Sequence, residues 1–263
     1  FMSLGVRAIP LERILIVTTD TIPSAIAGKM VGEIVAADYR TASVFDKYGI
    51  DFCCGGQTSI DAACLEKGVA LEAVLQDLEK AEQAPGLVEQ HDQWPLDFLA
   101  DYIVNQFHNY TKDMLPRLTE YVETVANVHG ATHPETLTIA ELWPGVRGEL
   151  AMHMQKEELM LFPYIKRLVH SEAEGTAPKK PPFGSAEDLI VQMEEEHDNT
   201  GNALGEMERV TQGFTVPADG CATFQTLYAY LKEFDAATKK HVHMENNILF
   251  PKAIALERTL VAA

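Results

Sequence analysis

Four long stretches in the second part of the chain carry apolar residues at the three- and four-residue spacing of an amphipathic helix. Helix start and stop signals place these stretches at about residues 95–127, 134–170, 185–212 and 218–260. Short or proline-marked connections join them, including a loop from Ser171 to Phe183. Long amphipathic helices connected in this way predict an antiparallel up-down four-helix bundle.

Details of the first two stretches give further predictions. Pro116 is expected to kink the first helix, and Trp143-Pro144-Gly145 indicates an irregularity near the start of the second. The residues expected on the buried face of the first helix are Phe98, Ile103, Phe107, Leu115 and Leu118.

A shorter helical pattern precedes the bundle. Apolar residues recur at helical spacing from Val31 to Tyr48, and Gly49 supplies a stop. A glycine-rich turn, Asp51-Phe52-Cys53-Cys54-Gly55-Gly56, comes next, followed by a short helix to Lys67 and another from Ala70 to Gln83. This part of the chain therefore predicts a small helical domain that displays a pair of cysteines on a turn.

The predicted fold class is all-α, in four parts. Residues 1–30 are an extension of unknown role, in which 13–19 has the β-branched content of a short strand. Residues 31–83 form the small domain, 84–95 a proline- and glycine-containing linker, and 96–263 the bundle.

One motif occurs twice in the bundle. The pattern H-x3-E-x3-L-F-P begins at His153 and again at His241, 88 residues later. Positions i and i+4 of a helix share a face, so each copy directs an imidazole and a carboxylate the same way. His108 lies 45 residues before His153, and His197 lies 44 residues from both motif histidines. In an up-down bundle this even spacing brings all four imidazoles to one level.

These residues predict a metal site in the bundle core. An apolar interior carries carboxylates only where they are paired or bind metal. Four imidazole nitrogens and two shared carboxylates can hold two ions, bridged in addition by an oxo or hydroxo group, and leave an open position for a small ligand. Mixed imidazole and carboxylate ligation favours iron over manganese or zinc. The predicted ligands are His108, His153, Glu157, His197, His241 and Glu245.

Other polar residues are assigned lesser roles. Glu149 and Glu196, each close in sequence to a predicted ligand, are expected to hydrogen-bond to the site or to line a path to it. His243 follows a predicted ligand by two residues, so it points to a different face, either beside the site or on the surface. Surface positions are predicted for His91, His129, His133 and His170.

The adjacent cysteines Cys53 and Cys54 leave two interpretations open. On a glycine-flanked turn they could be exposed, redox-active thiols that reach toward the metal site. Alternatively, they are a pair of small buried hydrophobic residues. In relaxed extended backbone, neighbouring cysteines do not both bind one metal, which argues against a closed zinc site made by this pair alone. Cys64 and Cys221 are predicted to pack in the interior.

Charge and apolar content exclude several classes of partner. With 21 Lys+Arg against 39 Asp+Glu, the net charge is −18, so neither nucleic acid nor a membrane surface is an expected partner. We identify no signal peptide and no run that approaches the roughly 18 apolar residues of a membrane span. Four irregularly spaced cysteines are too few for a disulfide framework, and we expect a cytoplasmic protein.

The cysteine turn and the bundle motifs occur together in a known family. Asp-Phe-Cys-Cys-Gly-Gly, a lone histidine, two H-x3-E motifs, a Glu-His pair and the Asn-Asn after the second motif resemble the iron-sulfur cluster repair di-iron proteins, the Repair of Iron Centres family. The resemblance covers about residues 31–258 and implies a hemerythrin-like bundle with a non-haem di-iron centre on the six ligands given above. It also implies paired thiols at Cys53 and Cys54 and channel-side glutamates at Glu149 and Glu196. The first 30 residues and the long loop at 171–183 depart from the family pattern.

The resemblance implies repair of iron-sulfur clusters damaged by nitric oxide or oxidants, with the damaged iron-sulfur proteins as partners. Repair would proceed by releasing iron for cluster rebuilding or by reducing nitric oxide at the iron pair, in which the paired thiols could help to return electrons; enzymatic activity is left open. The alternative is a hemerythrin-type carrier or sensor that binds oxygen or nitric oxide without turnover, although such carriers usually have five core histidines and only four are in phase here. A third interpretation is a metal-free bundle used for protein contacts. A homodimer is compatible with these predictions.

Overall fold

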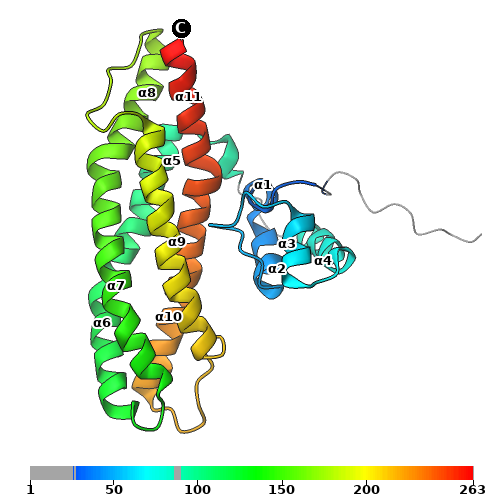
Figure 1. Cartoon of the computed structure of the whole chain (residues 1–263), viewed down its shortest axis with the longest axis vertical. Helices are drawn as coiled ribbons and strands as arrows, with labels where there is room; N and C mark the ends of the chain where they lie inside the picture. The colour runs from blue at the N-terminus through cyan, green and yellow to red at the C-terminus, as the bar shows by residue number, and fades with distance from the viewer. Residues whose placement is uncertain (1–25, 27, 86–89, 263) are drawn as a thin grey trace, which may run out of the picture.

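The computed structural model describes residues 26, 28–85 and 90–262, and it confirms the all-α prediction. Four long helical segments run antiparallel and form an elongated bundle (Figure 1). The segments are α5 (Leu96–Ile103) with α6 (Asn109–His129), α7 (Glu135–Lys156) with α8 (Phe162–Glu174), α9 (Ala186–Val210), and α10 (Ala222–Met244) with α11 (Phe250–Ala262). The strand-like stretch at 13–19 lies outside the described residues.

Three of the four segments contain a π-helical turn, which accommodates one extra residue and is found frequently at functional sites. The second and third of these turns begin at the glutamates of the two H-x3-E motifs, and the first ends at His108. Pro163 and Pro251 follow the second and third turns at the same distance. Because proline has no backbone N–H, it cannot continue the regular hydrogen-bond ladder, and the wider turn accommodates that loss. The π-helical turns span Val104–His108, Glu157–Leu161 and Glu245–Leu249.

Two apolar clusters fill the bundle on either side of its middle. One cluster lies among α5, α8, α11 and the first part of α9, and the other among α6, α7, α10 and the later part of α9. In the second cluster, Trp143 is buried and its indole Nε1–H donates to Thr119 Oγ1 at 2.9 Å. These clusters close off the middle of the bundle from both ends.

Two local predictions about the bundle are wrong. Phe98 is 52% exposed, because it packs against Trp94 on the outside of α5, with ring centroids 5.1 Å apart, rather than in the core. Helix α7 runs without interruption through Trp143-Pro144-Gly145. Pro144 removes one backbone hydrogen bond from this helix, and the burial of Trp143 and Val146 in the second apolar cluster offsets that loss. Pro116 lies inside α6 and does not end that helix.

A small helical domain lies beside the middle of the bundle (Figure 1). It has its own apolar cluster, which Val242 of α10 joins from the bundle. A 3-10 helix, His91–Gln93, precedes α5. The helices of the small domain are α1 (Val31–Ala37), a 3-10 turn (Tyr39–Thr41), α2 (Ala42–Lys47), α3 (Ile60–Lys67) and α4 (Leu71–Gln83).

Asn247, in the third π-helical turn, fixes the small domain against the bundle. Its side-chain Nδ2 donates to the backbone carbonyls of Phe52 and Cys53 at 3.1 and 3.2 Å. Gly32 and Gly56 flank the same amide so closely that a Cβ atom at either position would lie 2.2 or 2.3 Å from Asn247 Oδ1. Glycine at both positions therefore lets the cysteine turn approach the bundle.

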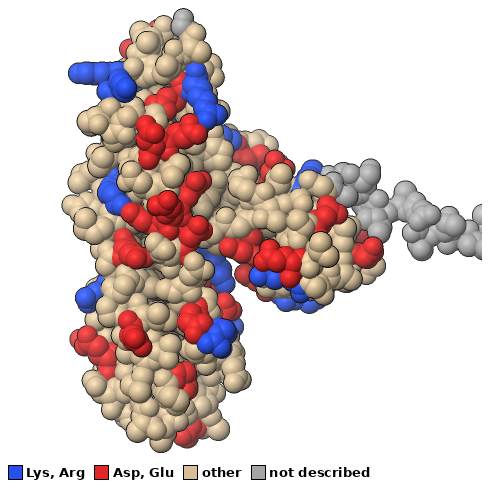
Figure 2. Space-filling view, viewed as in Figure 1, with Lys and Arg blue, Asp and Glu red and all other residues tan. Residues whose placement is uncertain are grey.

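Charge also bridges the two parts of the molecule. Lys239 of α10 forms ion pairs with Asp235 at 2.8 Å, with Glu208 at 3.4 Å and with Asp46 of the small domain at 3.8 Å. Figure 2 shows acidic side chains over the middle of the bundle and on the small domain beside it. Among the residues that the structure describes, no helix is long and apolar enough to span a membrane.

Candidate metal centre

The structure brings the six predicted ligands together in the middle of the bundle. Every one of the four helical segments contributes at least one side chain, and none is more than 2% exposed. The imidazoles come from the first π-helical turn, α7, α9 and α10, and the carboxylates from the first residues of the other two π-helical turns. The six are His108, His153, Glu157, His197, His241 and Glu245.

These side chains form two groups that share both carboxylates. Within each group the donor atoms lie within 4.8 Å of one another. A carboxylate has two oxygens, so a single glutamate side chain can serve both groups. One group holds His108 and His241, the other holds His153 and His197, and Glu157 and Glu245 belong to both.

Distances in the first group suit a cation. The Nε2 atoms of His108 and His241 are 3.2 Å apart, and His241 Nε2 is 2.9 Å from Glu245 Oε1. Two donors bound at right angles through bonds of about 2.1 Å lie about 3 Å apart. The donor separations therefore match neighbouring positions around one metal ion.

The second group has the same spacing. The Nε2 atoms of His153 and His197 are 2.9 Å apart, and His197 Nε2 is 3.2 Å from Glu245 Oε2. Glu157 Oε2 lies 3.2 Å from His153 Nε2 and 3.3 Å from His108 Nε2. This carboxylate therefore stands between the two groups.

Hydrogen bonds on the outer side of three imidazoles determine which nitrogen faces the centre. Nδ1 of His108 lies 2.8 Å from Glu158 Oε1, Nδ1 of His153 lies 3.0 Å from Glu196 Oε2, and Nδ1 of His197 lies 2.8 Å from Asn246 Oδ1. Those oxygens accept, so each Nδ1 carries the proton and a neutral ring presents an unprotonated Nε2 inward. In each group the lone pairs of the inward-facing Nε2 atoms point at one another. This arrangement requires a cation or protons between the rings.

The carboxylates show the same need for positive charge. Both oxygens of Glu157 and Oε2 of Glu245 are buried and have no hydrogen-bond donor. An ionised carboxylate that is buried without a partner is strongly unfavourable, whereas a coordinated one is not. The donor set therefore fits two metal ions.

The pKa values of the protein alone follow from the same geometry. Burial disfavours the charged imidazoles, but the carboxylates of Glu157 and Glu245 outweigh it and raise the pKa of His108 to about 9 and of His153 to about 10. Burial likewise opposes ionisation of Glu245, yet the surrounding imidazoles hold its pKa well below the usual range. The centre thus favours anionic carboxylates.

Two of the outer glutamates are arranged alike. Glu196 accepts from His153 and pairs with Lys156. The hydrogen bond from His153, together with the lysine, lowers the pKa of Glu196 to about 2. Glu158 accepts from His108 in the same way and pairs with Lys112 at 2.6 Å. Sequence reasoning identified Glu196 but missed Glu158 and Asn246, although each directly follows a predicted glutamate ligand.

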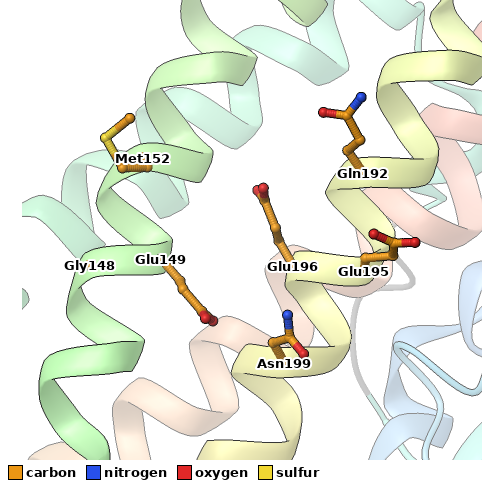
Figure 3. Close-up of a pocket in the computed structure, with 7 residues that line it drawn as sticks. All are labelled: Gly148, Glu149, Met152, Gln192, Glu195, Glu196 and Asn199. Carbon is orange, nitrogen blue, oxygen red and sulfur yellow. The ribbon is translucent and has the colours of Figure 1, made fainter.

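Glu149 and Glu196 line one surface groove of about 530 Å³ between α7 and α9 (Figure 3). Figure 3 shows both carboxylates on the sides of the groove, one from each helix. Glu196 reaches His153 at the inner end, whereas Glu149 is exposed. Through Glu196, the groove lies next to the outer side of His153.

The structure corrects part of the prediction for the remaining histidines. His91 is 3% exposed, because its ring packs against Trp94 and Tyr102. His243 is also buried, and its Nδ1 lies 3.1 Å from Asn247 Nδ2, away from the six ligands. His170 is exposed, and the two other histidines predicted at the surface are partly exposed.

Each interpretation of the cysteine pair describes one of the two residues. Cys53 is buried in the apolar cluster of the small domain, whereas Cys54 is partly exposed. Both line the cleft between the small domain and the bundle, which also reaches His197. Cys64 is buried as predicted, but Cys221 is exposed, because it stands at the residue before α10 rather than on the buried face of that helix.

The fold and the site define a hemerythrin-type bundle of the cation-binding class, extended by a small helical domain. Residues 99–253 match the family model described as hemerythrin HHE cation binding domain, and residues 27–82 match a domain of unknown function, DUF542. The iron-sulfur cluster repair proteins YtfE of Yersinia pestis (strain Pestoides F) and of Yersinia pseudotuberculosis serotype O:1b (strain IP 31758) are each 34% identical over 226 residues, which is 85% of this chain and 96% of the relative. The chain belongs to this family of iron-sulfur cluster repair proteins with a hemerythrin-like bundle. Family membership and the histidine and glutamate cluster support iron as the bound metal.

Proposed function

We propose that this chain is a non-haem di-iron protein that repairs iron-sulfur clusters damaged by nitrosative or oxidative stress. The two irons would be held by the four imidazoles and by Glu157 and Glu245 as bridges, together with an oxo or hydroxo group. The observation that carries the proposal is that two groups of buried donors share both carboxylates. The names of the related proteins support the repair role and, as clients, damaged iron-sulfur proteins.

Bound iron supplies reversible electron transfer and an open position for nitric oxide or oxygen. The chain's own residues orient the donors: Glu158, Glu196 and Asn246 each hold one imidazole by its Nδ1–H. The two apolar clusters exclude water from both ends of the site. Repair would proceed by iron donation, by reduction of nitric oxide, or by both.

The acidic groove supports iron donation. Glu149 and Glu196 place two carboxylates at the surface beside His153, where they would attract a cation to one side of the site. We further propose a reducing, cytoplasmic setting, in which the free thiols of Cys53 and Cys54 stay reduced.

Metal analysis of purified protein, combined with a repair assay on a nitric oxide-damaged iron-sulfur protein, tests this function. We expect about two irons per chain and the spectroscopic signature of an oxo-bridged pair. His153→Ala removes a buried donor and should lower iron affinity at least tenfold and abolish repair. His170→Ala, which changes an exposed histidine, is the matched control and should leave both unchanged.

Full iron occupancy and repair activity in His153→Ala would overturn the assignment of the site. Stable, reversible oxygen binding without any repair would instead identify a carrier of the hemerythrin type.

A further inference from the structure

The cysteine turn holds a third group of metal-binding side chains, separate from the six in the bundle. The Sγ atoms of Cys53 and Cys54 are 4.0 Å apart, and Cys53 Sγ is 3.2 Å from Asp51 Oδ1. One donor atom from each residue lies within 4.8 Å of the other two. The backbone N–H groups of Cys53 and Cys54 donate to Asp51 Oδ1 at 2.9 and 3.0 Å, which fixes the carboxylate beside the thiols.

The turn brings the two thiols closer together than a relaxed extended chain would. In tetrahedral coordination with metal–sulfur bonds of about 2.3 Å, two sulfurs lie about 3.8 Å apart, and a sulfur and an oxygen about 3.5 Å. The observed separations of 4.0 and 3.2 Å are close to both values. Two thiolates and one carboxylate leave a fourth position open, and thiolate ligands select iron, zinc and other soft or borderline ions.

The Asp51, Cys53 and Cys54 group lies close to the candidate metal centre of the bundle. Cys53, Cys54 and His197 line the same cleft of about 1010 Å³ between the small domain and the bundle. A Cβ atom added at Gly201 would lie 3.5 Å from Cys54 Sγ, so the thiol packs against α9 one helical turn after His197. The group therefore lies beside α9, one helical turn from a predicted ligand of the candidate metal centre.

We propose that Asp51, Cys53 and Cys54 form a second binding site for a thiophilic divalent cation, and that Fe²⁺ occupies it in passing between the bundle and the outside. Metal binding at the turn stands on the geometry above, whereas the passage of iron rests on the proposed function. Binding forms two metal–sulfur bonds and releases two thiol protons to solvent, and the oxidation state of the metal does not change.

Protons compete with a metal ion for the Cys53 sulfur. The hydrogen bond with Cys54, together with burial, raises the pKa of Cys53 well above its usual value. Metal and protons therefore compete for the sulfurs, and affinity should fall as the pH falls.

Titration of the metal-free full chain with Co²⁺ tests the site, because sulfur-to-cobalt charge-transfer absorption reports thiolate ligands and the six bundle donors are nitrogen and oxygen. The experiment uses a Cys221→Ser background, since Cys221 lies 3.2 Å from an imidazole nitrogen of His129 and could contribute a sulfur signal. At saturation we expect one thiolate-bound cobalt per chain, in addition to the cobalt that the six bundle donors take up. Adding Cys53→Ser and Cys54→Ser should abolish the absorption, and either substitution alone should weaken binding at least tenfold.

Cys64→Ser is the matched control, because it places the same substitution at a buried cysteine of the same domain. It should keep the absorption. Should the double variant not fold, as judged by its melting curve, Cys54→Ser alone decides the question, since this thiol is partly exposed. Absence of the absorption while cobalt fills the bundle, or its persistence after Cys54→Ser with unchanged affinity, would overturn the proposal.

Iron release to a chelator tests the passage separately. The double cysteine variant loaded with iron should lose it several-fold more slowly than the background protein and the Cys64→Ser control. Equal rates of iron release in these proteins would show that iron does not pass through the cysteine turn. A native protein that lacks the iron pair would overturn the proposed function instead, and the cobalt result would be unaffected.

Discussion

Asn246 provides the sharpest test of how the bundle orients its donors. Its Oδ1 accepts from Nδ1–H of His197 at 2.8 Å, in a region where both residues are buried. Asn246→Ala removes this acceptor and leaves all six predicted ligands in place. The imidazole N–H is then left without its partner, and the ring is free to protonate Nε2, the nitrogen that faces the centre.

The size of the effect follows from the burial of this hydrogen bond. A buried donor that loses its acceptor costs about 1–3 kcal/mol. If the loss falls on the metal-bound state, iron affinity decreases about 5- to 150-fold. Asn246→Asp keeps an acceptor oxygen at the same position and should retain most of the affinity.

Competition with a chelator of known affinity measures the iron affinity of each variant. Asn199→Ala is the matched control, because Asn199 is an exposed residue on the rim of the groove between α7 and α9. We expect it to bind iron within about twofold of the unmodified protein, as surface substitutions usually change stability by less than about 0.5 kcal/mol. Unchanged affinity in Asn246→Ala, or an equal loss in Asn199→Ala, would refute the reasoning.

Two further predictions concern the contact between domains and the far end of the bundle. Gly56→Ala places a Cβ 2.3 Å from Asn247 Oδ1 and should lower the free energy of unfolding by about 1–3 kcal/mol in chemical denaturation. Gly205→Ala is the control, because nothing lies within 4 Å of its new Cβ, and it should leave the stability unchanged. Equal stabilities of the two variants would contradict the close fit. Backbone N–H groups at the start of α10, together with His129, lower the pKa of Cys221 to about 7. The rate of its alkylation by iodoacetamide should therefore rise as the pH passes through about 7, and His129→Ala should move that midpoint upward. An unchanged midpoint in mass-spectrometric labelling would contradict this role of the imidazole.

Helix periodicity and motif spacing predicted much of this molecule. The four helical segments follow from the 3.6-residue repeat of apolar positions, which is a local property of the chain. The six candidate ligands follow from the H-x3-E spacing and from the near-constant interval between histidines, since helix geometry converts both into position along a bundle. The structure brings those six side chains together.

Local patterns did not predict what surrounds these residues. Glu158 and Asn246 reach imidazoles on other segments, His108 and His197, and that depends on how each helix is rotated against its neighbour. His91 has a polar side chain in a linker, yet Trp94 and, from α5, Tyr102 cover it. The glutamate and asparagine contacts join residues about 50 positions apart in sequence, and the burial of His91 depends on how the linker folds back on the start of α5.

The arrangement of the two domains was likewise decided by tertiary structure. The glycines of the cysteine turn predicted only a turn, whereas the fold uses Gly56 and Gly32 to admit the amide of Asn247. That close approach places Cys53 and Cys54 in the cleft that reaches His197. The sequence by itself determined the helices and the level of the histidines, because both depend on distances along the chain. Only packing decided which side chains support the ligands and where the thiols lie, because both depend on the rotation and approach of whole helices.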